Sequence, residues 1–339
     1  MPKDPGIYVK SPSANSKYAT AGFWVDDCIV IGSQRELTSL TKSVDAKYGI
    51  TGLGEVRWVL SMLLECDCSK RTITISQEAF IDSILTHFNL VDMTTIMMPF
   101  TPGSHLSSTN CPTDDNKIHE KGTCPYRELI RALLWLTLST QPDIAFAAGS
   151  LAHFGHNPSH IHWEAVKWVL CYPKMWHLKL GGKTLQITTS TNADWGSHSN
   201  DHHLIGTYII KVGIGAISWK SKKQACVALL SSEVEYMALC QASKEAVWTA
   251  DFLGNIGVEL WGPMVVNADN QGSIALTKNP VFHDHSKHVD IQYHLMHNLV
   301  KQEKIQLNYV PTKDMLADIL MKSLPQAQHE LLSIGIGMF

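Results

Sequence analysis

The sequence predicts an α/β protein in which an α+β segment and a helical segment precede a mixed sheet with helices on its faces. From residue 185 onward, three strand-length apolar runs are followed by helix, strand and helix, and later by a last strand and helix, which is the order of such a sheet. Before residue 185, a predicted hairpin and an amphipathic helix precede a Pro-, Ser- and Thr-rich stretch, residues 99–122, and predicted helices follow it.

The totals place the chain among folded globular proteins. Its 339 residues leave room for two domains, and 45% hydrophobic with 17% charged residues is ordinary for a packed core. A net charge of −3 excludes a strongly basic nucleic-acid binder, so we expect modest affinity for phosphate backbones, through local patches such as Lys220, Lys222 and Lys223. The eight cysteines lack paired zinc spacings, and no apolar run could span a membrane. We expect an intracellular protein, cytoplasmic or nuclear, with reduced thiols and no membrane partner.

The first hundred residues contain a predicted hairpin. Gly22–Gly32 consists of two apolar runs around Asp26 and Asp27, which predicts two strands with both carboxylates at their turn. An ordinary Asp-rich turn and a metal-binding hairpin are both compatible with this pattern. Residues 5–10 form a possible short strand and Gln34–Lys47 an amphipathic helix.

Helices are predicted for the next segment. Residues 125–154 suggest two helices broken at Gln141-Pro142, because proline cannot continue a helix. Residues 157–174 suggest a third helix that ends near Tyr172-Pro173. Its region holds four histidines whose spacings fit no common metal-ligand set, so surface or core histidines are expected: His153, His156, His160 and His162.

The second half is organised around residues 216–242. Ala216–Trp219 suggests a strand, the three lysines a basic turn, and Val227 with Leu229 another strand. Ser231 and Ser232 lie just ahead of a predicted helix that holds Glu235 near its start. Further on, one strand ends at Asp269, and a last strand is followed by a turn at Pro311 and a helix carrying Asp318.

The amino-acid motifs in these segments are more specific than their hydrophobic pattern. SW-x-SKKQ followed by SSEVEY closely resembles the ribonuclease H region of copia-type long-terminal-repeat retrotransposons, and residues 24–27 (WVDD) resemble the Y-V-D-D of reverse transcriptases. The resemblance runs from about residue 5 to the C-terminus. It implies a strand within residues 49–65, then a strand and a helix over residues 71–85. It implies a truncated palm and thumb (1–98), a linker (99–122), a helical connection (123–184) and a ribonuclease H-like domain (185–339).

The resemblance also implies a chemistry and its residues. The family synthesises DNA on RNA and hydrolyses the RNA strand of RNA–DNA hybrids, using carboxylates that hold two Mg²⁺ or Mn²⁺ ions. The palm pair corresponds to Asp26 and Asp27. The four ribonuclease positions are matched by Asn192, Glu235, Asp269 and Asp318, with Glu233 a poorer match than Glu235.

The first ribonuclease position is therefore an amide, with one acceptor oxygen and two N–H donors. Asp194 lies two residues on, on the same face of the strand but roughly 6.5–7 Å along it. The opening 20 residues have no counterpart of the fingers or of the first palm aspartate. We expect a chain that is inactive as a polymerase and weak or inactive as a nuclease.

Two alternatives remain open. One is a non-catalytic module that binds RNA–DNA hybrids or RNA, and the other is an active nuclease that uses Asp194. Several family arginine positions hold His, Gln or Cys, which suggests decay of arginine codons by cytosine deamination. The same hypothesis explains the tract from His283 to His297 better than a zinc site does. The oligomeric state is not predictable from the sequence.

Overall fold

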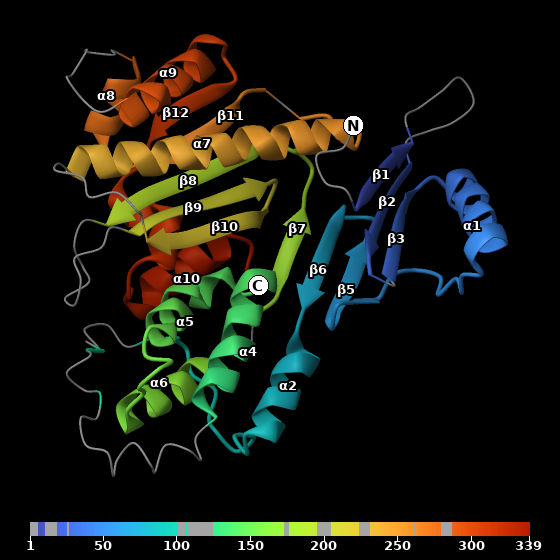
Figure 1. The fold of residues 1–339 in the computed structure, drawn as a ribbon, viewed down its shortest axis with the longest axis horizontal. Coiled ribbons are helices and arrows are strands. Elements are labelled where there is room, and N and C mark those ends of the chain that lie inside the picture. The colour runs from blue at the N-terminus through green and yellow to red at the C-terminus, as the bar shows by residue number, and fades with distance from the viewer. Residues whose placement is uncertain are drawn as a thin grey trace.

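The computed structural model describes residues 6–10, 19–25, 27–100, 106–107, 111, 125–172, 176–194, 205–223, 231–260, 262–278 and 287–339. In these ranges the strands form three sheets, of three, four and five strands (Figure 1). The five-stranded sheet is mixed and carries helices on both faces, so the predicted α/β class is confirmed.

The first sheet confirms the predicted hairpin. It comprises β1 (Ile7–Lys10), β2 (Ala19–Trp24) and β3 (Asp27–Gly32), all antiparallel, and α1 (Gln34–Tyr48) follows. The single strand expected within residues 49–65 is wrong. That segment contains the hairpin β4 (Trp58–Val59) and β5 (Met62–Asp67), which turns at Leu60 and Ser61 with positive φ at both residues. β6 (Thr72–Ser76) and α2 (Glu78–His87) follow as expected.

A helical cluster packs beside this part. It comprises α4 (Tyr126–Ser139), a 3₁₀ turn (Pro142–Ile144), α5 (Ala145–Ala152) and α6 (His160–Cys171). The predicted break at Gln141-Pro142 is confirmed. Leu129, Leu133 and Leu136 of α4 are fully buried against α5 and α6 in one apolar core. α6 ends at Cys171, near the predicted end at Tyr172-Pro173, and Pro173 itself lies outside the described residues.

β7 (Leu178–Gly181) was not predicted from the sequence. It pairs antiparallel with β6 and so completes the four-stranded sheet β4-β5-β6-β7. The C-terminal residues lie along its other side. Lys179 N donates to Gly337 O at 2.8 Å, and Ala216 N donates to Ile336 O at 2.8 Å. The end of the chain therefore connects β7 to β10 (Gly215–Lys223) of the five-stranded sheet.

The large sheet has the order β10-β9-β8-β11-β12. Its strands are β8 (Ile187–Asp194), β9 (Ile205–Val212), β10 (Gly215–Lys223), β11 (Met264–Ala268) and β12 (Ile305–Tyr309). The first three pair antiparallel, whereas β8, β11 and β12 are parallel. This is the mixed sheet that the sequence predicts for residues 185–339.

Each face of the large sheet has its own core. α7 (Ser231–Asn255), α8 (Gln271–Lys278) and α9 (Lys287–Lys301) share a core with one face, which α7 crosses in Figure 1. Two 3₁₀ turns (Thr312–Asp314 and Leu316–Leu320) and α10 (Gln326–Gly335) follow β12, and the second turn and α10 cover the other face. Along β9, Tyr208 and Ile210 join the first core and Ile209 joins the second, as strand alternation requires.

Three local predictions are corrected here. β10 runs through Lys223, because its residues pair with β9 as far as Lys223↔Ile205, so the lysines lie on a strand and not in a turn. The strand expected through Val227 and Leu229 lies outside the described residues. Ser231 is the first residue of α7, and Asp318 lies on a 3₁₀ turn instead of an α-helix. Among the described helices, none combines the length and the hydropathy needed to cross a membrane.

Candidate active site

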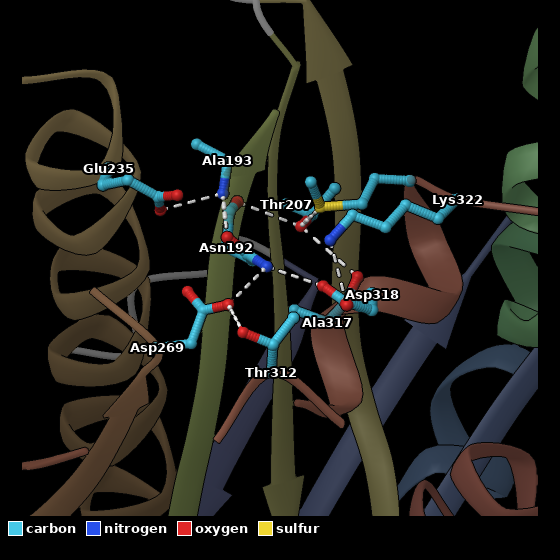
Figure 2. A network of polar contacts seen from close by, with 10 residues as sticks. Asn192, Ala193, Thr207, Glu235, Asp269, Thr312, Ala317, Asp318 and Lys322 are labelled. Atoms are coloured by element: carbon cyan, nitrogen blue, oxygen red, sulfur yellow. Dashed lines mark hydrogen bonds and ion pairs between the residues drawn. The ribbon is translucent and has the colours of Figure 1, made fainter. Parts of the chain in front are cut away.

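Asn192 lies at the centre of a group of carboxylates. Its side chain is 2% exposed, and its amide Nδ2 donates to Asp318 Oδ1 at 2.6 Å and to Asp269 Oδ2 at 3.2 Å (Figure 2). Its Oδ1 accepts the backbone N–H of Ala193 at 2.7 Å. The amide therefore links two acidic residues that are 77 and 126 positions away in the chain.

The fold brings these residues together. β8 and β11 are parallel neighbours, so Asn192 near the end of β8 and Asp269 just after β11 meet at one edge of the sheet. Asp318 comes from the 3₁₀ turn that packs on β8 and β9. Thr207, paired with Asn192 across the strands, donates from its hydroxyl to Asn192 O at 3.1 Å.

Glu235 reaches the group from α7, on the opposite side of β8. Its Oε2 accepts the backbone N–H of Ala193 at 3.0 Å (Figure 2). Burial, and then the negative charge of Asp269, raises the pKa of Glu235 to about 8. Burial also raises the pKa of Asp318, although Lys322, whose Nζ lies 3.0 Å from Asp318 Oδ2, and Asn192 oppose that rise.

Comparison with known proteins gives the ancestry. No known protein-family model matches the chain. A retrovirus-related Pol polyprotein from transposon TNT 1-94 of Nicotiana tabacum is 33% identical over 346 residues, which cover 99% of this chain and 25% of that protein. The corresponding protein from transposon RE1 of Arabidopsis thaliana is 30% identical over 322 residues, which cover 93% of this chain and 21% of that protein. This chain belongs to the copia-type Pol polyproteins of transposons. It spans about a quarter of the length of these relatives.

Among solved structures, a foamy viral protease-reverse transcriptase in complex with double-stranded DNA is similar at 13% identity. The match has a TM-score of 0.46 and covers 86% of this chain and 46% of that one.

The other candidate residues of the Pol chain lie elsewhere or outside the described side chains. Asp194 ends β8, with its backbone paired to Ile205, but its side chain is not among those described. The same holds for the side chain of Glu233, and Asp26 lies outside the described residues. Asp27 begins β3 and is exposed, in a different sheet from Asn192.

Two residues in contact with the carboxylates were missed by sequence reasoning. Lys322 pairs with Asp318, and the Thr312 hydroxyl donates to Asp269 Oδ2 at 3.0 Å. The four-residue spacing of Asp318 and Lys322 was a usable signal, because such pairs often face each other. Thr312 had no signal, since only the turn after β12 directs it to Asp269.

The Pol chain's residues do not fit the two-metal centre that its ancestry implies. Magnesium requires oxygen ligands, whereas Asn192 presents an N–H donor toward Asp269 and Asp318. Both oxygens of Asp318 already accept hydrogen bonds, from Asn192 and from Lys322. In the part of the chain that the structure describes, no group of three or more His, Cys, Asp or Glu residues is arranged to hold a metal ion.

Proposed function

We propose that this Pol-derived chain does not hydrolyse the RNA strand of RNA–DNA hybrids. One observation carries the proposal: Asn192 Nδ2 donates to both Asp269 and Asp318. The position where the family has its first carboxylate is therefore occupied by a donor that engages two of the three remaining ligands.

The chemistry explains why this single atom matters. Phosphodiester hydrolysis by two metal ions needs carboxylate oxygens that bridge the ions and offset their charge. Asn192 is neutral, and its one oxygen already accepts from Ala193.

We further propose, by descent, that the partner is an RNA–DNA hybrid or RNA, met in the cytoplasm or nucleus. The proposed organisation is a reverse transcriptase palm and thumb segment (1–98), a linker (99–122), a helical connection (123–184) and a ribonuclease H-like domain (185–339). Asp26, Asp27, Glu235, Asp269, Asp318 and Asp194 are the proposed remnants of sites that once held Mg²⁺ or Mn²⁺.

The test is cleavage of a labelled RNA–DNA hybrid in Mg²⁺ or Mn²⁺. Wild type is compared with Asn192→Asp, and Asn298→Asp on the exposed face of α9 is the matched control for the same chemical change. We expect cleavage by Asn192→Asp only.

Cleavage by wild type would contradict the proposal, and loss of that cleavage in Asp194→Asn would then identify Asp194 as the substitute ligand. Cleavage by none of the three proteins would leave the chain inactive but would show that Asn192 is not the sole reason.

A second candidate function is binding without cleavage. It is favoured by cationic residues beside the carboxylates: Lys322 contacts Asp318, and Lys313 is exposed next to Thr312. Such binding would be electrostatic and would weaken steeply with salt. Fluorescence anisotropy with a labelled hybrid at 50 and 200 mM salt tests it, and absence of binding at the lower salt concentration would refute it.

A further inference from the structure

We infer that Asn192 takes the structural place of a divalent cation, so that the carboxylate group of this chain is held together without metal. The inference rests on the proposed function, because it explains what the exchange of carboxylate for amide does to the site. It concerns stability and ion dependence, which can be measured without any catalysis.

Acidic side chains from three separate elements are directed toward Asn192, and of these Asp318 is buried whereas Glu235 and Asp269 are half-buried. Glu235 comes from α7, Asp269 follows β11 and Asp318 lies on the 3₁₀ turn after β12. Charges of one sign that are gathered away from water repel each other, unless cations or hydrogen-bond donors compensate them.

An asparagine side chain can compensate these negative charges by donating hydrogen bonds to the carboxylates. Asparagine has two N–H donors and one acceptor oxygen. Here the Nδ2 group donates to Asp318 at 2.6 Å and to Asp269 at 3.2 Å, and the oxygen accepts from Ala193. Because Asn192 is only 2% exposed, water has little access to replace these donors. One side chain thus joins β8, the end of β11 and the 3₁₀ turn.

Two further donors complete the arrangement. Lys322 Nζ lies 3.0 Å from the second oxygen of Asp318, and the Thr312 hydroxyl donates to Asp269 at 3.0 Å. Lys322 is 34% exposed and Asp318 is 2% exposed, so the ammonium partly covers a buried carboxylate (Figure 2). Lys322 offsets the negative charge of Asp318, and the Thr312 hydroxyl adds a hydrogen bond to Asp269.

The converse follows for an aspartate at the same position. Asn192→Asp replaces the donor nitrogen by an oxygen of nearly the same size, which removes both hydrogen bonds and adds a negative charge. Without a divalent ion this change destabilises the sheet edge. With Mg²⁺ the added oxygen becomes a ligand, so stability should become dependent on the ion.

The experiment is thermal unfolding of the full-length chain in EDTA and in a series of MgCl₂ concentrations. The proteins are wild type, Asn192→Asp, Asn192→Ala and the surface control Asn298→Asp. We expect the Tm of wild type and the Tm of the control each to stay constant, within about 1 °C, from EDTA to the highest MgCl₂ concentration. Asn192→Asp should unfold roughly 3–8 °C lower in EDTA and regain most of this loss in MgCl₂. Asn192→Ala should lose stability in EDTA and regain none of it.

Either of two results overturns the inference: a Mg²⁺-dependent rise in the Tm of wild type that the control shares, or an Asn192→Asp protein as stable as wild type in EDTA. If Asn192→Asp does not fold, the comparison of wild type with Asn192→Ala tests the inference. An Asn192→Ala protein with the same Tm as wild type would also overturn the inference. Hybrid cleavage by wild type would refute the proposed function alone, so the two failures are distinguishable.

Discussion

The C-terminal segment offers a sharp test of how this fold is held together. Gly337 lies where the end of the chain passes between β7 and β10, and its φ is +96°. A Cβ added to Gly337 would lie 2.6 Å from Gly215 Cα and 2.9 Å from Lys179 O. Both are backbone atoms of the adjoining segments, which cannot rotate away as a flexible side chain could. Gly337→Ala should therefore destabilise the junction of the two sheets.

Two contributions determine the expected magnitude. A non-glycine residue forced to positive φ costs about 1–2 kcal/mol. Overpacking against backbone that must shift costs a further 1–3 kcal/mol or so. We expect Gly337→Ala to lower the free energy of unfolding by about 2–5 kcal/mol.

The assay is urea denaturation followed by tryptophan fluorescence and circular dichroism, with the midpoint expected to fall by about 1 M or more. Gly254→Ala is the matched control, since Gly254 lies within α7 and nothing is within 4 Å of its added Cβ. The control should be neutral or stabilising by about 0.5–1 kcal/mol. Equal midpoints for Gly337→Ala and wild type would refute the close approach of these three segments.

Three further predictions concern buried polar groups. Burial raises the pKa of the Asp143 carboxyl, so its stabilising contribution is present below the unfolded carboxyl pKa of about 3.9 and is lost as the pH rises through the folded pKa. Asp143→Asn should therefore gain stability relative to wild type between pH 4 and pH 7, and an unchanged Tm difference would contradict this. Tyr172→Phe removes the hydrogen bond from the hydroxyl to Asp143 Oδ2 at 2.7 Å and should cost about 1.5–3 kcal/mol in urea denaturation, unlike Tyr309→Phe at the surface. Lys10→Met leaves the buried Glu36 carboxylate without its ion-pair partner at 2.6 Å. It should lower the hydrogen-exchange protection of β1 and β2 by about 1–2 kcal/mol. The double variant Lys10→Met with Glu36→Met should recover this protection, and failure to do so would argue against the pair.

Much of the fold followed from local sequence pattern. The hairpin of β2 and β3, the helix break at Gln141-Pro142 and the order of β8 to β12 were predicted because side-chain periodicity and proline geometry act over a few residues. The residue types at the candidate site were also readable, including the amide at Asn192. Where the local pattern was ambiguous, the prediction failed. The lysines of β10 were predicted to form a turn, but pairing with β9 places them in a strand.

The sequence by itself determined the ancestry, the α/β class and the exchange of a carboxylate for an amide at position 192. Only the tertiary structure decided what that exchange does. Local pattern does not specify which distant groups an amide faces, and the donation of Asn192 to Asp269 and Asp318 depends on a parallel strand pair and a 3₁₀ turn. The pairing of β7 with β6 and the seating of Gly337 against β10 likewise arise from contacts distant in sequence, because backbone hydrogen bonds between strands carry no local sequence signature.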